Sequence, residues 1–500
     1  MVGLQWRVQT SNGSSKLLVP ESGLIRKTWL WFLGLLFELK SKVGRFFKKA
    51  WALGIEDPKK VIHCLKVAIA LTLVSLLYYV RPLYEGVGEQ DAIWAVMTVV
   101  VVFEYTAGAT IYKSLNRITG TILAGTLAVI IHWFAIKLGK SFELVIIGAS
   151  VFVSASAATF TRFIPTIRLR FDYGAVIFIL TYSLIAVSGF RIENLFQMGY
   201  LRVSTIVIGT VLCMLISMLI CPVWAGEELH LLITRNMENL ANSLEGCVTD
   251  YFKEKNSKGN VDNDDKTHKI LLGYKCVLNS KAAEESFANF AIWEPAHGCF
   301  RFRHPWKQYL KIGASMRNCA FCIEILNSCI NSEFQLQAPD FIKKHFSDAC
   351  IILSSYSSRV LKELVISITT MRRSFKIELS VREMKDALRE LQNVLKSLHS
   401  CLLSTPPPPS SPLPENSEET TKEPISTPTT TVPLMEVIPL LTVASLLIEI
   451  VARIEGVVKA VNELTNLADF KPQIEKPMKL TREPSSGYQD QETLKALEQV

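Results

Sequence analysis

Lysine and arginine residues stand inside, or at the ends of, the most apolar segments of this sequence. Between residues 61 and 222, eleven Lys/Arg residues and seven Asp/Glu residues leave a formal charge of +4 (11 − 7). A charge at the centre of a membrane helix costs about 2.5–3.5 kcal/mol, so such a side chain tends to face a water-filled cavity or a partner. Rings of Lys and Arg replace the lost hydration of a carboxylate or an inorganic anion. The cations therefore predict an anion pathway, with candidate lining residues Lys66, Lys113, Arg117, Arg162 and Arg168.

Each of these residues also has a simpler interpretation. Lys66 lies less than two turns from the start of its apolar segment, where its ammonium group could snorkel to the membrane surface. Arg117 and Arg168 could be ordinary orientation signals beside a membrane helix. Residue type and spacing alone leave both interpretations open.

A cluster of acidic residues follows the first apolar segment, at Glu85, Glu89 and Asp91. Carboxylates are the oxygen ligands that hard divalent and trivalent cations prefer, so the cluster is a candidate extracellular cation sensor. The simpler alternative is a solvated loop. Cys319 and Cys322 have the spacing of zinc ligands, but no second pair matches them, and we expect them to pack between helices.

The sequence shows no motif typical of an enzyme or of a nucleic-acid-binding protein. The chain has no P-loop, dinucleotide fingerprint, nucleophile elbow or metalloprotease motif, and no nucleophile–base pair or metal-ligand set is visible. No long Lys/Arg run interleaved with aromatic residues indicates nucleic-acid binding. We therefore expect neither an enzyme nor a bound cofactor or metal.

The elements that must position the cations are membrane helices. A hydrocarbon core of about 30 Å requires about 20 apolar residues in a helix. Six segments with apolar residues on every face approach this length, and they are residues 61–80, 92–105, 118–136, 144–160, 174–190 and 203–224. The N-terminal flank and the even-numbered connections are the more basic ones, which places both termini in the cytoplasm.

The remaining sequence divides by composition. Residues 1–60 form a cytosolic segment with an interfacial amphipathic helix, whose Lys40, Lys42, Arg45, Lys48 and Lys49 are expected to meet lipid headgroups. After the transmembrane domain at 61–224, amphipathic patterns predict a cytosolic helical domain at 225–403. We expect a disordered Pro-rich linker at 404–432, a C-terminal helix packing on the helical domain at 433–470, and a flexible tail at 471–500. The predicted fold is an all-α membrane protein, a six-helix bundle with a cytosolic helical domain.

Several long segments resemble a known family. They are 56–80 (EDPKKVIHCLKVAIALTLVSLLYYV), 92–110 (AIWAVMTVVVVFEYTAGAT), 113–117 (KSLNR), 162–174 (RFIPTIRLRFDYG), 178–190 (FILTYSLIAVSGF), 221–230 (CPVWAGEELH) and 293–309 (WEPAHGCFRFRHPWKQY). In this order they resemble the plant aluminium-activated malate transporter family, over about residues 51–470. The run 300–309 is more similar to the plasma-membrane malate exporters of that family than to its vacuolar members.

The resemblance implies a homodimeric, six-span anion channel for malate, other carboxylates and inorganic anions. Lys66 matches the family's basic position in the first span, Lys113 and Arg117 its K-x-x-N-R element, and Arg162 and Arg168 its RF-x-P-x-x-[KR] element. By the same comparison, Trp293, Glu294 and Pro295 form a Trp-Glu-Pro segment with a structural or gating role.

The sequence thus predicts voltage-driven efflux of malate-like anions through a plant membrane, gated by voltage, anions or aluminium. A divalent anion leaves a negative interior without a coupled ion, and neutralising Arg117 or Arg162 is expected to reduce the current. The vacuolar membrane is the alternative location. A membrane-anchored scaffold and an exporter of aromatic acids are the alternative functions.

Overall fold

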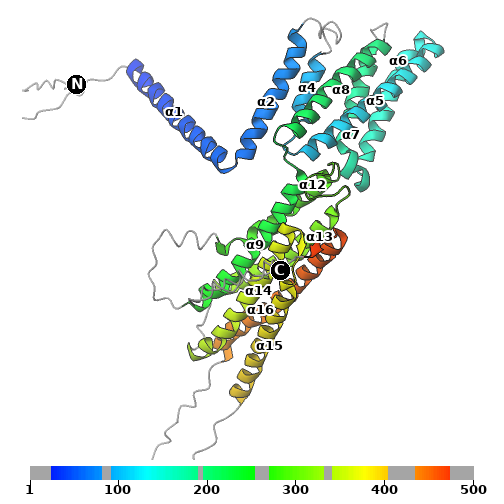
Figure 1. Cartoon of the computed structure of the whole chain (residues 1–500). Coiled ribbons are helices and arrows are strands. Elements are labelled where there is room, and N and C mark those ends of the chain that lie inside the picture. The colour runs from blue at the N-terminus through cyan, green and yellow to red at the C-terminus, as the bar shows by residue number, and fades with distance from the viewer. Residues whose placement is uncertain are drawn as a thin grey trace, which may run out of the picture. The chain divides into compact units, whose positions relative to one another are not determined.

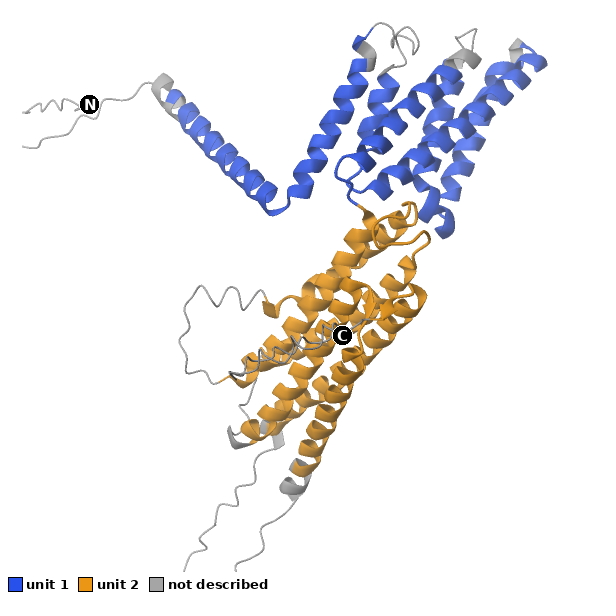
Figure 2. Ribbon diagram, viewed as in Figure 1, with its two compact units in different colours: residues 1–223 blue, residues 224–500 orange. Residues whose placement is uncertain are grey.

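The computed structural model describes residues 24–80, 92–189, 195–253, 270–331, 340–403 and 434–472. These residues form two compact units, residues 1–223 (unit 1) and 224–500 (unit 2) (Figure 2). The acidic cluster Glu85, Glu89 and Asp91, the predicted linker 404–432 and residues 473–500 lie outside the described residues.

Unit 1 consists of helices (Figure 1). They are α1 (Leu24–Glu56), α2 (Pro58–Tyr79), α4 (Ala92–Val102), α5 (Ala107–Leu138), α6 (Lys140–Thr161), α7 (Pro165–Gly189) and α8 (Leu195–Leu219). Two of them begin at a proline, Pro58 and Pro165, where the missing N–H costs no helical hydrogen bond. The α5 helix begins after Thr106, whose Oγ1 accepts a hydrogen bond of 3.3 Å from the Ala109 N–H.

Small residues let α5 and α7 approach closely. Gly120 of α5 faces the backbone of α7, and a Cβ there would lie 2.7 Å from the Gly174 oxygen. Ala124 and Ala128 continue this buried face of α5 and pack with Tyr182 of α7. The Tyr182 hydroxyl donates a 2.7 Å hydrogen bond to Ser150 of α6, which joins the three helices. This is close packing of the kind that small residues four apart permit in membranes.

The second predicted span is shorter in the structure than in the sequence analysis. The α4 helix ends at Val102 and has 11 residues, about 16 Å at 1.5 Å per residue. Glu104 lies in the turn to α5, where its N–H bonds to Thr110 Oγ1 at 3.1 Å and Thr106 caps the next helix. The turn at Glu104 and the cap at Thr106 compete with helix formation. The apolar run from Ala92 to Tyr105 is therefore helical only as far as Val102.

The outer faces of α5 and α6 expose large apolar side chains, as a bilayer would require. They include Leu123, Ile130, Trp133, Phe134, Phe142, Leu144, Val145, Phe152, Val153 and Phe160. Among the described residues, five helices are long and apolar enough to cross a membrane, namely α5, α6, α7, α8 and α16. The predicted class of an all-α, multi-pass membrane protein is confirmed, while the count of six spans stays a prediction.

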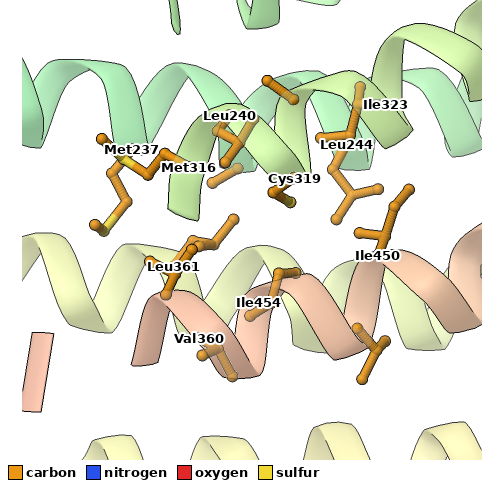
Figure 3. Close-up of a cluster of buried hydrophobic side chains, with 14 of the residues drawn as sticks. Met237, Leu240, Leu244, Met316, Cys319, Ile323, Val360, Leu361, Ile450 and Ile454 are labelled. Atoms are coloured by element: carbon orange, nitrogen blue, oxygen red, sulfur yellow. The ribbon is translucent and has the colours of Figure 1, made fainter. Parts of the chain in front are cut away.

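Unit 2 is an assembly of helices with one short pair of parallel strands. Its elements are α9 (Ala225–Phe252), α11 (Tyr274–Asn279), α12 (Lys281–Ala291), α13 (Trp306–Ile330), α14 (Asp340–Thr370), β1 (Arg372–Arg373), α15 (Lys376–Leu403), α16 (Leu434–Leu467) and β2 (Lys471–Pro472). Their apolar faces form one core, in which Leu240 of α9, Cys319 of α13, Leu361 of α14 and Ile454 of α16 lie close together (Figure 3).

The α16 helix is as apolar as a membrane span but lies in the core of unit 2. Its buried side chains recur every three or four residues, for example Leu440, Leu447 and Ile454, and pack with α13 and α14. The other face carries charges, and Glu455 pairs with Lys385 of α15 at 3.3 Å. Protein contacts therefore cover the apolar stripe that a bilayer would otherwise have to cover.

Candidate functional site

Lys66 is a buried cation held by a helix end. Its side chain is 2% exposed, and Nζ donates a 2.8 Å hydrogen bond to the Cys221 carbonyl just beyond α8. Carbonyls at the end of a helix lack partners within that helix, so they attract a cation. Cys221 has a positive φ of 41°, an uncommon conformation for a non-glycine residue, which takes its backbone out of the helical path of α8. Within the described ranges, the hydrogen-bond partner of the Lys66 ammonium group is thus a neutral oxygen atom.

Arg117 is a second buried cation with a neutral partner. It lies on α5, is 5% exposed, and donates from Nε to Thr98 Oγ1 of α4 at 3.1 Å. The Thr98 hydroxyl in turn donates to the Trp94 carbonyl at 2.7 Å. The guanidinium group is therefore oriented against α4 through a neutral hydroxyl.

Lys113 lies one turn before Arg117 and is compensated. It forms an ion pair with Glu104 and lies 3.5 Å from the Val101 carbonyl. Its Nζ is also 5.6 Å from the centre of the Tyr173 ring, a cation–π distance. Tyr173 interacts electrostatically with both Lys113 and Arg117, so this aromatic residue of α7 links the two cations.

Arg162 and Arg168 have different surroundings. Arg162, at the end of α6, binds both carboxylate oxygens of Asp172 on α7, with distances of 2.7 and 3.3 Å. This bidentate pair is a strong, oriented contact that joins α6 to α7. Arg168 is exposed on α7, and none of the hydrogen bonds or ion pairs found within the described ranges involves its side chain.

Sequence analysis missed one cation, Arg202. The predicted sixth span begins at residue 203, directly after Arg202, but α8 starts at Leu195, and Arg202 lies two turns inside that helix. Its guanidinium carbon is 4.7 Å from the centre of the Trp94 ring of α4. The run before Val203 mixes polar and apolar residues, so its helical nature is not visible from hydropathy alone.

Three of these cations contact α4, and the fourth, Lys66, binds the Cys221 carbonyl beyond α8. We call Lys66, Lys113, Arg117 and Arg202 the basic cluster. The partners on α4 begin at Trp94 and end at Val101, about 10 Å along the helix axis. Glu104 is the acid that compensates Lys113, and His63 of α2 interacts electrostatically with both Lys66 and Glu104. Within the described ranges, this arrangement gathers several cations inside apolar helices, and Glu104 pairs with one of them, Lys113, so the cluster favours an anion.

The predicted Trp-Glu-Pro segment caps a helix in unit 2. Glu294 is 6% exposed, and its two carboxylate oxygens accept hydrogen bonds from the N–H groups of Ala225 (2.6 Å) and Gly226 (3.0 Å). These are the first residues of α9, where free N–H groups and the helix dipole favour a negative charge. Pro295 contributes its carbonyl, 2.8 Å from His297 Nδ1, and Trp293 is half-buried. The geometry is that of a structural cap.

Cys319 and Cys322 are packed as expected for helix residues. Cys319 is fully buried in the core of unit 2, and burial raises the pKa of its thiol. Cys322 packs partly buried against the same core. A group of three or more potential metal ligands was not found in the part of the chain that the structure describes.

Comparisons with known proteins agree with this architecture. A family model described as "Aluminium activated malate transporter" matches residues 51–409 and 407–465. Aluminum-activated malate transporter 10 of Arabidopsis thaliana is 50% identical over 481 residues, which cover 94% of this chain and 95% of the relative. Aluminum-activated malate transporter 1 of Arabidopsis thaliana is 41% identical, covering 89% and 84% of the two chains.

A relative from a second plant gives the same result. Aluminum-activated malate transporter 1 of Triticum aestivum is 38% identical over 456 residues, which cover 90% of this chain and 91% of the relative. All these relatives are named as transporters, which agrees with the prediction that the chain is not an enzyme. The family resemblance of the sequence is confirmed, and the chain belongs to the plant aluminium-activated malate transporter family.

Proposed function

We propose that this protein is a channel for malate and other anions in a plant membrane, and that the basic cluster lines its conduction path. The buried position of Arg117 and Lys66 carries this proposal, since the side-chain hydrogen bonds that they make within the described ranges go to neutral oxygen atoms. A charge in an apolar helix bundle is costly, and an anion passing beside it offsets that cost. The family membership supports malate as the transported anion.

Efflux needs no coupled ion. With a negative interior, each charge that leaves gains about 2.3 kcal/mol per 100 mV. A malate dianion therefore gains about twice this energy, and the basic cluster only has to lower the barrier that the bilayer imposes. Coupled transporters use chains of Asp, Glu or His side chains, whereas Glu104 is paired with Lys113.

The proposal is tested by two-electrode voltage clamp in oocytes loaded with malate, comparing the wild type with Arg117→Gln. At an effective dielectric constant of about 20, a unit charge about 8 Å away is worth roughly 2 kcal/mol for each anion charge. We therefore expect a roughly tenfold or larger loss of inward current carried by malate efflux. Arg117→Lys keeps the charge and should retain more current than Arg117→Gln.

The matched control is Arg235→Gln, which removes one exposed arginine from α9 in unit 2 and should conduct like the wild type. Surface expression is measured for every variant. Unchanged malate current in Arg117→Gln at normal surface expression would overturn the pore assignment. No current from the wild type at the surface would favour the scaffold function instead.

Arg162 needs a paired design because Asp172 neutralises it. Arg162→Gln alone leaves the Asp172 carboxylate without its Arg162 partner, a negative charge that should repel a passing anion, and is expected to reduce current. In Arg162→Gln with Asp172→Asn, both charges are absent, and current should recover if Arg162 acts only through this pair. Failure of the double variant to recover, with normal expression, would support a direct role of Arg162 in the pathway.

The finer points of location and gating are part of the same proposal. We place both termini in the cytoplasm, because the N-terminal flank and the even-numbered connections are the more basic ones. We place the protein in the plasma membrane, because residues 300–309 are more similar to the plasma-membrane exporters of the family. A fluorescent fusion in plant cells tests this location against the vacuolar membrane. Recording with and without external aluminium, in the wild type and in Glu85→Gln with Glu89→Gln and Asp91→Asn, tests the acidic cluster as a cation sensor.

A further inference from the structure

Unit 2 contains a cavity of about 350 Å³ that the proposed transport function does not use. It is formed by the segment that runs from the end of α12 at Ala291 to Lys307, in the first turn of α13. This volume falls within the range of about 300–1,000 Å³ that ligand pockets occupy. The apolar side chains that line it include Ile292, Phe300 and Trp306.

The charged residues around the cavity are mainly cations. Arg301, Arg303 and Lys307 contribute to its lining, and all three are exposed. The acid that lines it, Glu294, has both carboxylate oxygens occupied by the N–H groups of α9. An exposed ion pair of 3.4 Å joins Arg301 to Asp469, and such a pair holds a side chain only weakly. The cavity therefore combines an apolar interior with a positive entrance.

The walls of the cavity are held in place by the surrounding core. Buried His304 lines the cavity, and its Nε2 lies 3.3 Å from the Tyr309 hydroxyl, which His230 Nδ1 also contacts at 3.1 Å. Trp306 packs so closely on α9 that a Cβ at Gly226 would collide with its ring. Arg303 has a positive φ of 65°, which is uncommon for a non-glycine residue and places its backbone in a sparsely populated conformation. The His304 and Trp306 walls of the cavity are thus fixed by contacts with the core of unit 2.

From this geometry we infer that the cavity binds an amphipathic organic anion, with an aromatic or alkyl body and one carboxylate or phosphate group. The body would pack on Ile292, Phe300 and Trp306, and the anionic group would pair with Arg303 and Lys307. Malate fits this cavity poorly, because it has two carboxylates and no apolar body to cover the walls. A soluble organic acid and the headgroup of an anionic lipid share the required chemistry.

The inference is tested by binding, independently of current, on the full chain in phosphatidylcholine nanodiscs. The probe is 2-naphthoate, with its neutral analogue 2-naphthamide as comparison, and calorimetry measures affinity. We expect saturable binding of naphthoate and much weaker binding of the amide. Arg303→Gln with Lys307→Gln should bind naphthoate roughly tenfold more weakly, which corresponds to about 1.4 kcal/mol.

Two further variants separate this site from general charge and from misfolding. Lys344→Gln with Arg382→Gln removes two exposed cations from α14 and α15 and should bind naphthoate like the wild type. Ile292→Trp keeps the cations but fills the cavity, and should also lose binding. Each variant is compared with the wild type by its thermal unfolding midpoint.

The outcomes decide between the alternatives. Equal binding of acid and amide, equal binding by wild type and Arg303→Gln with Lys307→Gln, or no binding of naphthoate would each overturn the inference. Loss of naphthoate binding when phosphatidic acid is added to the nanodisc would support the site and identify a lipid headgroup as the occupant. Continued binding in phosphatidic acid would support a soluble organic acid.

Discussion

At the scale of single residues, cations that look alike in the sequence differ in what compensates them. Lys66 and Arg117 donate to neutral oxygen atoms, whereas Lys113 and Arg162 are paired with Glu104 and Asp172. The partners in these pairs are nine and ten residues apart, on different elements, so periodicity within one helix does not predict them. Sequence spacing identifies the candidate cations, but only the fold shows which of them pair with a carboxylate.

Two histidines buried in unit 2 make its stability depend on pH. Burial lowers the pKa of His230 to about 4, and burial together with His230 lowers the pKa of His304 to about 4. In the unfolded chain both would titrate near about 6.5. The unfolded state therefore binds more protons between these values, and the free energy of unfolding falls as pH drops from about 6.5 toward about 4.

The measurement is the thermal unfolding midpoint of the purified chain between about pH 7.5 and about pH 5. We expect the midpoint to fall on acidification in the wild type and to fall less in His230→Gln with His304→Gln, whose amides do not titrate. Each midpoint is referenced to the same variant at neutral pH, since the substitutions also alter the contacts to Tyr309. An equal fall in both proteins would assign the pH dependence to carboxylates instead.

At the scale of elements, α1 illustrates a helix with little contact to the other described helices. It packs on α2, and its large apolar residues, including Trp29, Phe32, Phe46 and Phe47, are exposed. Lys42, Arg45, Lys48 and Lys49 gather on the opposite side at helical spacing. This separation of faces is that of a helix lying at a membrane surface.

The prediction for α1 concerns a peptide of residues 24–56 and its binding to lipid vesicles. Each Lys or Arg near an anionic surface is worth about 1 kcal/mol. Lys42→Gln, Arg45→Gln, Lys48→Gln and Lys49→Gln together should weaken binding to vesicles containing phosphatidylserine by roughly 4 kcal/mol, about a thousandfold. Binding to pure phosphatidylcholine is the control and should change little. Equal losses on both kinds of vesicle would show that the basic face does not meet headgroups.

The helices themselves were largely predictable, because hydropathy and apolar periodicity are local properties. Predicted segments correspond to α5, α6 and α7, and to the long helices of unit 2. The predicted helix boundaries were wrong at two places. At Glu104 and Thr106 a turn and a helix cap end the apolar run, and at Arg202 a helix extends beyond its apolar stretch. The cap that Glu294 places on α9 joins residues 69 apart, and no local pattern predicts such a contact.

At the scale of the whole molecule, the open question is the oligomeric state, that is, how many copies of the chain assemble. The resemblance implies a homodimer, so native mass spectrometry of the protein in detergent should give twice the mass of one chain. The same measurement on the Arg117→Gln variant is the control, since a pore residue should leave assembly unchanged. A species with the mass of one chain across all protein concentrations would contradict the homodimer.

The position of α16 has a consequence for synthesis on the ribosome. This helix is synthesised after the other described helices of unit 2, yet Leu440, Leu447 and Ile454 lie in the core of that unit. The apolar faces of α13 and α14 therefore stay uncovered until α16 has been synthesised, and chaperones would have to shield them. A stop codon anywhere between residues 404 and 433 would yield a protein with every helix of unit 1 but without α16 in unit 2. Cellular quality control should degrade this protein even though its membrane helices are intact.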